Sequence, residues 1–322
     1  MRLKLVPDNT NVNFFQSTRL TFGASVLAMI LSIFLFFFNG LNLGIDFLGG
    51  TTIRTDSQTS VDIAAYRAAL KPLNLGDVTV TEIFDVTKPD LNAAQIRFEA
   101  QSGEEAATVE VIRSVKAALM SLDETITFPQ VESVGPEVSG ELVQAAITAV
   151  LAAIGAVLFY IWLRFEWQFS VGAIAALVHD IVITIGIFSL LQIKFDLAII
   201  SALLTIVGYS LNDTVVVFDR VRENLRKYKK TPLKDLLNMS INATLSRTVM
   251  TSLTTLIALI SLFILGGDVI HGFVFAMIWG VIIGTYSSVF VASSILLRLG
   301  VKRDWDKTND GKAGTQFAGI DA

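Results

Sequence analysis

The chain has 322 residues, of which 52% are hydrophobic and only 17% charged, and its mean hydropathy is +0.61. This composition lies well outside that of a soluble globular domain and indicates a membrane protein. The sequence contains no cysteine, which excludes a disulfide framework, a thiol nucleophile and a thiolate metal site, and its net charge of −4 is too small to indicate a partner.

Six apolar runs are long enough to cross a bilayer as helices, which takes about 20 residues each. They are predicted at 20–38, 143–163, 169–191, 197–218, 249–265 and 273–297. The first run is too long for the hydrophobic region of an ordinary signal peptide, and no small-x-small cleavage site follows it, so we expect a retained anchor. The segment 39–140 remains as one large hydrophilic insert, and 141–298 forms a bundle of five helices.

The distribution of Lys and Arg in the short connections predicts the orientation of these helices. Most of the basic residues lie in the N-terminal arm 1–19, the loop 219–247 and the tail 299–322, whereas the opposite side has only Lys194 in its short loops. Both termini are therefore expected in the cytoplasm. The insert, with 15 acidic and 7 basic residues, is expected on the outer, periplasmic side. The polar, aperiodic tail is expected to be disordered.

Within the insert, the residue pattern becomes that of a small mixed domain. Strands are predicted at 51–56, 78–84, 94–99 and 125–134, and helices at 60–70 and 104–122. Ser60 is the expected N-cap of the first helix, and a turn containing Pro89-Asp90 joins the two middle strands. The order βαββαβ is that of a ferredoxin-like domain, although a fold alone indicates no chemistry.

The loop between the fourth and fifth membrane segments contains a further helical pattern. Thr231-Pro232 is typical of an N-cap followed by a first helical position. Apolar residues then recur at helical spacing, at Leu233, Leu236, Leu237 and Ile241. We therefore predict a short amphipathic helix lying at the membrane surface.

One ionisable residue in the fourth apolar run and another at the start of the fifth are the first candidates for a functional site. Asp213 lies within the fourth run, beside Asn212, and Arg247 opens the fifth. Charged groups at such positions cost several kcal/mol unless they face a bundle interior, an opposite charge or water, so they usually carry protons, ions or substrate. Counted from the outer ends of their helices, the two residues lie within about 3 Å of the same depth, so we predict that they meet.

A static ion pair is the alternative interpretation, with Arg247 extended to the lipid headgroups. Against it, Asp213 has polar neighbours in Ser210 and Asn212, and a carboxylate that changes protonation needs hydrogen-bond partners in both states. Arg247 also shares a helix face with Thr251, followed by Thr254 and Thr255, and such a polar stripe is not expected to face lipid.

A second polar group, His179-Asp180, lies near the middle of the third segment. It is either a second proton relay station or a structural pair that is bonded to neighbouring hydroxyls. In the sixth segment, Gly280 and Gly284 form a small-xxx-small face that indicates close helix packing. The sequence shows no phosphate loop, nucleophile triad, metal cluster or nucleic-acid surface, so we expect neither an enzyme nor a metal site.

Four motifs resemble those of the SecF family, the smaller membrane subunit of the bacterial SecDF accessory translocase. They are Asp46-Phe47-Leu48-Gly49-Gly50-Thr51, the run from Gly208 to Asn224, Ser246-Arg247-Thr248, and Gly284-Thr285-Tyr286-Ser287-Ser288. The resemblance covers nearly the whole chain, from the first helix to the sixth.

The resemblance implies a half-unit of the RND type in the bacterial inner membrane. Such a subunit pairs with SecD and uses the proton-motive force to pull unfolded preproteins from the SecYEG channel after SecA-driven insertion. YajC is a further candidate partner. Protons are the coupling ion, and no other cofactor is implied.

The family's proton path carries over to Asp213 and Arg247, with Asn212 and Thr251 beside them, while His179-Asp180 matches a motif shared by both subunits. Phe47, Gly49, Gly50 and Thr51 are implied to shape the junction between the first helix and the insert.

Two rival functions remain open from the residues. One is half of a proton-coupled exporter of small molecules or lipids, which needs a substrate cleft in a much larger outward region. The other is a scaffold that stabilises SecD without pumping. A neutral substitution at Asp213 separates the scaffold from the pump.

Overall fold

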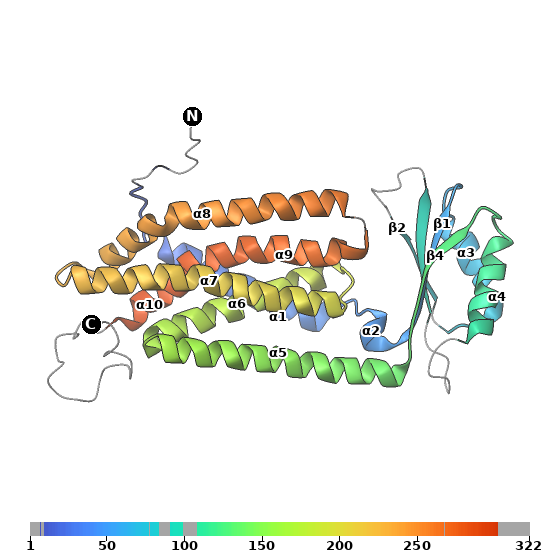
Figure 1. The fold of residues 1–322 in the computed structure, drawn as a ribbon, viewed down its shortest axis with the longest axis horizontal. Helices are drawn as coiled ribbons and strands as arrows, with labels where there is room; N and C mark the ends of the chain where they lie inside the picture. Colours follow the sequence, from blue (N-terminus) through green and yellow to red (C-terminus); the bar gives the residue numbers. More distant parts are fainter. Residues whose placement is uncertain are drawn as a thin grey trace, which may run out of the picture.

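The computed structural model describes residues 7, 10–76, 78–83, 91–98, 108–266 and 268–301. Long helices lie side by side in a bundle, and a small sheet domain projects from one end of it (Figure 1). The predicted disordered tail, from residue 302, and the predicted Pro89-Asp90 turn lie outside the described residues.

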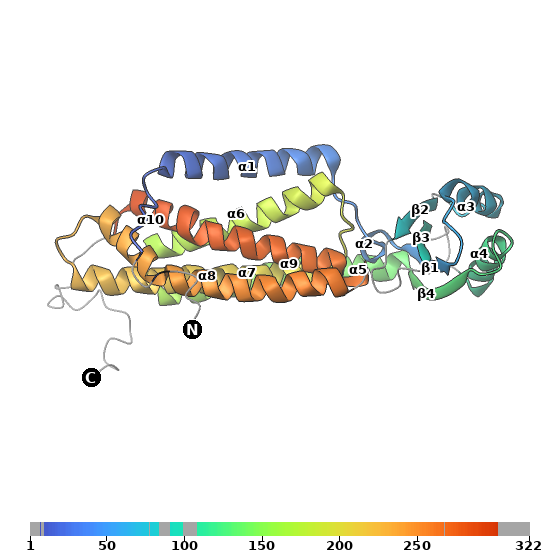
Figure 2. The same cartoon turned by 90° about the horizontal axis from the view of Figure 1, so that it is seen from above.

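In the part of the chain that the structure describes, six helices are long and apolar enough to cross a membrane, as predicted. They are α1 (Thr18–Asn39), α5 (Pro136–Arg164), α6 (Trp167–Leu191), α7 (Leu197–Lys227), α8 (Leu233–Leu265) and the series α9 (Asp268–Ser287), π-helical turn η2 (Ser288–Ala292) and α10 (Ser293–Leu299). About half of the residues in α6 and in the last series are buried within the chain, whereas few are buried in α1, α5 and α8. Figure 2 shows α1 along one edge of the bundle, next to α6.

The sheet domain has the predicted order βαββαβ. Its elements are β1 (Gly50–Ser57), α3 (Ile63–Leu70) with the turn η1 (Lys71–Leu73), β2 (Val78–Ile83), β3 (Asn92–Phe98), α4 (Val109–Met120) and β4 (Thr127–Val134). The strands pair in the order β2-β3-β1-β4, all antiparallel, and Ile53 lies opposite Ile96 and Val131. Both helices cover one face of the sheet (Figure 1), where Ile53, Ile96 and Leu119 belong to a buried apolar core.

The N-cap of the first helix in this domain is Asp62 and not the predicted Ser60. The Asp62 carboxylate accepts hydrogen bonds from the backbone N–H groups of Ala64 and Ala65, at 2.9 and 3.1 Å. A carboxylate satisfies two of the orphan donors of a helix start, so the helix begins two residues later than the apolar spacing suggested.

The predicted surface helix before the fifth membrane segment is wrong as a separate element. The helix α8 begins at Leu233, after Pro232, and continues without a break to Leu265. Leu236, Leu237 and Ile241 are fully buried in the core of the bundle. The apolar face therefore packs on neighbouring helices, and no Gly or Pro interrupts the chain before the membrane segment.

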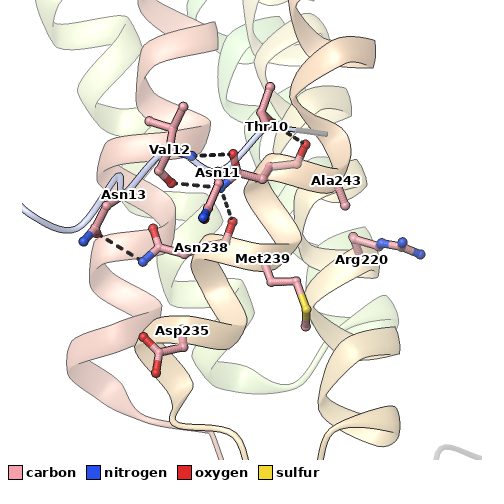
Figure 3. A pocket seen from close by; sticks show the side chains of 10 residues that line it. Thr10, Asn11, Val12, Asn13, Arg220, Asp235, Asn238, Met239 and Ala243 are labelled. Atoms are coloured by element: carbon pink, nitrogen blue, oxygen red, sulfur yellow. Dashed lines mark hydrogen bonds between the residues drawn. The ribbon is translucent and has the colours of Figure 1, made fainter. Parts of the chain in front are cut away.

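The N-terminal arm lies against the first half of α8 (Figure 3). The Asn242 side chain holds both backbone groups of Val12, accepting from its N–H at 2.9 Å and donating to its carbonyl at 2.8 Å. One turn earlier, Asn238 accepts from the Phe14 N–H at 3.0 Å. The arm and the start of α8 therefore lie at the same end of the bundle, opposite to the sheet domain (Figure 1).

Candidate functional site

Asp213 lies on α7 at a point where three helical elements meet. Its side chain is 8% exposed. It accepts hydrogen bonds from Thr248 Oγ1 on α8 at 2.7 Å and from Ser288 Oγ, at the start of η2, at 2.6 Å. Among the described residues, no ion pair joins Asp213 to a cation. The carboxylate is held by hydroxyl groups only.

Asp180 on α6 forms a second buried carboxylate site. Its Oδ2 accepts from Ser210 Oγ on α7 at 2.5 Å and from Ser287 Oγ on α9 at 2.8 Å. Its Oδ1 lies 2.9 Å from Nδ1 of His179, whose ring stacks on Tyr286. The structure thus brings the predicted pair His179-Asp180 into the bundle interior, beside the helix that carries Asp213.

Consecutive serines connect the two carboxylates. Ser287 bonds Asp180 and Ser288 bonds Asp213, because successive side chains on a helix point about 100° apart. The helix changes here from α to π geometry, and Ser293 Oγ donates to the Ser288 carbonyl at 3.2 Å. Single π turns within α-helices occur frequently at functional sites.

Gly284 permits the close approach of α9 to α7, in agreement with the close packing predicted for this glycine. A Cβ at position 284 would lie 3.0 Å from Cβ of Ser210, so a larger residue would push α9 away from α7. One turn earlier, a Cβ at Gly280 would overlap the Ile206 side chain. The small residues therefore set the spacing at which Ser287 and Ser288 reach their carboxylates.

Among the described residues, Arg247 forms no ion pair with Asp213, so the predicted direct contact is wrong, although the charge of Arg247 still acts on Asp213. Arg247 is exposed on α8, as are Thr251 and Thr254, and the next residue, Thr248, makes the contact with Asp213. The inward stripe of α8 consists of Ser240, Thr244, Thr248 and Ser252. The depth predicted for the contact on α8 was correct to within one residue, but the predicted face of the helix was wrong. The four-residue spacing of these hydroxyls was the signal that would have shown it.

Asn212 is also exposed, although its neighbour Asp213 is buried. It belongs to a polar or small stripe on the outside of α7 at helical spacing, formed by Ser201, Thr205, Gly208 and Asn212. Together with Arg247 and Thr251 on α8, these residues place polar groups on the outer surface of the bundle, inside the apolar spans.

The Asp46 to Thr51 motif lies where α1 leads into the sheet domain, through the short helix α2 (Ile45–Leu48). Gly49 and Gly50 have φ angles of +71° and +119°, which side chains disfavour, so both glycines are required by the backbone. The Phe47 ring packs on Phe195, with centroids 6.0 Å apart, and Thr51 Oγ1 lies 2.6 Å from Ser133 Oγ of β4. The motif therefore lies at the predicted junction between the first membrane helix and the sheet domain.

Known proteins match most of the chain. Residues 114–302 match the family "Protein export membrane protein SecD/SecF, C-terminal", and residues 34–61 match "SecD/SecF GG Motif". Protein translocase subunit SecF of Cereibacter sphaeroides is 59% identical over all of this chain and 99% of that protein. SecF of Vibrio alginolyticus is 40% identical over 91% of this chain and 91% of that protein.

Two crystal structures of SecDF also match at 35% identity. The structure of SecDF, a translocon-associated membrane protein from Thermus thermophilus, matches over 92% of this chain with a TM-score of 0.82. SecDF in a super-membrane-facing form matches over 93% of this chain with a TM-score of 0.68. The chain spans only 39% and 40% of the length of these two SecDF chains.

Proposed function

The chain belongs to the SecD/SecF family of protein export membrane proteins, as a SecF subunit of the protein translocase, and on this premise we propose that it is a proton-driven subunit of a preprotein export complex. It pairs with a SecD polypeptide in the bacterial inner membrane, with both termini in the cytoplasm. It uses the proton-motive force to draw unfolded preproteins out of SecYEG after SecA has inserted them, with YajC as a further partner.

The single observation that carries the proton role is that, among the described residues, the hydrogen-bond donors of buried Asp213 are all hydroxyl groups and no cation forms an ion pair with it. A permanent ion pair would hold a carboxylate in its charged form. Hydroxyl groups both donate and accept, so Thr248 and Ser288 can turn to serve either the carboxylate or the protonated acid. A group surrounded in this way can take up and release a proton without leaving a buried polar atom unsatisfied.

The exposed polar surface on α7 and α8 supports the pairing with SecD. Asn212, Arg247 and Thr251 lie within membrane spans but are exposed on the surface of the chain's own bundle. Polar groups in lipid are costly unless another protein surface or water covers them, and small residues such as Gly208 favour close helix contact. A partner helix bundle placed here would cover this surface and bring Arg247 to the rim of the proton site.

The magnitude of the driving force suits this function. One proton that moves down about 150 mV yields about 3.5 kcal/mol, which biases a two-state movement by a few hundredfold. A stable domain has a free energy of unfolding of about 5–15 kcal/mol, so one proton does not unfold it. The energy is sufficient to prevent an unfolded chain from sliding back.

The decisive experiment replaces Asp213 by Asn in the complex with SecD. The change removes the charge but keeps the size of the side chain, so assembly is expected to persist while export driven by the membrane potential is lost. Asp219→Asn is the control, because it neutralises a partly exposed carboxylate on the same helix, one that pairs with Arg164 outside the Asp213 site. Normal potential-driven export by Asp213→Asn would leave the chain as a scaffold for SecD.

A further inference from the structure

The segment that leads into the sheet domain is fastened to the start of α7. Leu43 and Phe195 form a parallel bridge, in which the Gly44 N–H donates to the Phe195 carbonyl at 2.8 Å. The Phe195 N–H donates to the Asn42 carbonyl at 2.7 Å. These bonds join the end of α1 to the loop between α6 and α7.

The Asp46 carboxylate extends this connection to α7 itself. Its Oδ2 accepts a hydrogen bond from the N–H of Leu197, the first residue of α7, at 3.0 Å. The first N–H groups of a helix have no partner within the helix, and a negative charge there is favoured by the helix dipole. Helix α7 already has its own N-cap, Asp196, which accepts from the Ile199 N–H. Asp46 is therefore an additional cap, supplied from 151 residues earlier in the sequence.

The backbone and packing explain the other residues of the motif but not its carboxylate. Gly49 and Gly50 are needed for their φ angles, and Phe47 packs on Phe195. Within the described residues, the Asp46 side chain makes one hydrogen bond, and its partner is the first residue of α7. Its position at the start of the motif thus serves the bundle and not the sheet.

From Asp46 the connection continues in both directions through rigid elements. Toward the sheet, only Gly49 separates α2 from β1, and Arg97 of β3 donates to the Leu43 carbonyl at 2.8 Å. Toward the membrane, α7 continues unbroken to Asp213, a distance of about 24 Å at 1.5 Å per residue. The sheet domain and the proposed proton site are thus connected through one helix.

Space for movement lies beside this connection. A cavity of about 430 Å³ separates the helix-free face of the sheet from the loops of the bundle. Its walls carry charges of both signs, from Asp46, Arg54, Glu132, Lys194, Asp196 and the ring of His271. A cavity at a junction, unlike a packed interface, allows the sheet domain to change its angle to the bundle without breaking an apolar core.

We propose that Asp46 is a positioning residue that couples the sheet domain to α7, so that a displacement of α7 turns the domain about Gly49 and Gly50. The proposal rests on the proposed function in one respect, namely that a change of protonation at Asp213 displaces α7. The hydrogen bond to Leu197 transmits the movement, because it joins the motif to the helix end directly.

The test measures the angle of the sheet domain in the full chain, in complex with SecD, in lipid nanodiscs. The absence of native cysteines allows spin labels at Ser114→Cys on α4 and Leu265→Cys at the end of α8, both exposed. Asp46→Ala is expected to widen the distribution of label distances, and Asp46→Asn, which keeps an acceptor oxygen, to widen it less. Asp62→Ala is the matched control, because it removes a helix cap wholly within the sheet domain.

A second measurement reports directly on the hydrogen bond between Asp46 and the Leu197 amide. Hydrogen exchange at the Leu197 amide is expected to rise about fivefold in Asp46→Ala, the equivalent of a lost cap of about 1 kcal/mol. Exchange deeper in α7, at Asp213, is expected to stay unchanged. Equal exchange at Leu197 in both proteins, or an unchanged distance distribution, would overturn the proposal.

The transmission step is tested by combining variants. Asp213→Asn alone is expected to shift the mean label distance, and Asp46→Ala is expected to abolish that shift. Persistence of the shift in the double variant would show that the coupling runs elsewhere. Normal export by Asp213→Asn defeats the proposed function instead, and a wider distribution in Asp46→Ala would still establish the tether.

Discussion

Two carboxylates in different regions of the molecule are bound by the same kind of group. Asp123 in the sheet domain accepts hydrogen bonds from Ser57 Oγ at 2.5 Å, Thr59 Oγ1 at 2.6 Å and Thr125 Oγ1 at 2.7 Å. Asp213 in the bundle accepts from Thr248 and Ser288. Both carboxylates accept hydrogen bonds from hydroxyl groups, but they differ in their exposure to water.

Water has access to Asp123, so its hydroxyl ligands add to hydration, and the pKa of the carboxyl falls well below its ordinary value. These bonds tie the end of β1 to the start of β4. Asp213 is buried among helices, where its hydroxyl ligands replace hydration instead of adding to it. The same ligands thus make a structural tie in water and a site suited to proton exchange within a membrane.

If the sheet domain and the loop after α7 lie on opposite sides of the membrane, an impermeant reagent added to intact cells should reach only the sheet domain. This is the largest expected effect. A cysteine at Gln58, beside the Asp123 cluster, should react with an impermeant thiol reagent added to intact cells. A cysteine at Lys230, in the loop after α7, should react only after the cells are opened. Both positions are exposed in the structure. Labelling of Lys230→Cys in intact cells would reverse the predicted orientation.

Removal of the two hydroxyl groups that bond Asp213 should impair export. The double substitution of Thr248 and Ser288 by Ala leaves Asp213 buried without its donors, and each bond to a charged group contributes about 1.5–3 kcal/mol. We expect potential-driven export to fall by about tenfold or more, since 1.4 kcal/mol corresponds to a factor of ten. Thr254→Ala, exposed on α8, is the control in the same export assay. Equal export by both proteins would contradict the assigned role of the hydroxyls.

Helix spacing is the next determinant of the Asp213 site. Gly284→Ala adds a Cβ at 3.0 Å from Ser210 and should destabilise the assembled bundle by about 1–3 kcal/mol, the usual effect of overpacking. Gly155→Ala, where no atom lies within 4 Å of the added Cβ, is the control. Thermal unfolding in detergent measures both. An unchanged melting temperature for Gly284→Ala would mean that α9 can move aside at no cost.

The smallest expected effect concerns pH and Asp123. Because the folded-state pKa is depressed, the carboxylate stabilises the sheet domain fully above its unfolded pKa of about 3.9, and this contribution is lost as pH falls toward the folded value. The isolated segment 50–134, which has its own core, should therefore melt at a lower temperature below pH 4. Asp123→Asn should be less stable at pH 7 and show a weaker dependence on pH. Parallel melting curves for the two proteins across this range would refute the assignment.

Much of the fold follows from local patterns. The six apolar runs and the alternating strands of the insert predicted six spanning helices and the order βαββαβ, because hydrophobic periodicity depends on residues close in sequence. Errors arose where a neighbour from another part of the chain decided the outcome. The 233–241 segment has an amphipathic pattern that suits a membrane surface or a helix interface equally well. Its burial against the bundle made it the start of α8.

In the candidate site, too, some features followed from the sequence and others required the tertiary structure. The presence of Asp213 and Asp180 inside apolar runs marked both as functional candidates, because an ionisable residue in such a run is rare and its residue type and position can be read from the sequence. Which residues contact them depends on the rotation of each helix about its axis. That rotation placed Thr248 inward and Arg247 outward.

The sequence by itself determined the membrane class, the number of spans, the inserted ferredoxin-like domain and the two carboxylates, since composition and periodicity are local properties. Only the tertiary structure decided that Ser287 and Ser288 connect these carboxylates and that Asp46 caps α7. Such contacts join residues up to 151 positions apart. They depend on helix rotation and spacing, which result from the packing of all the helices together.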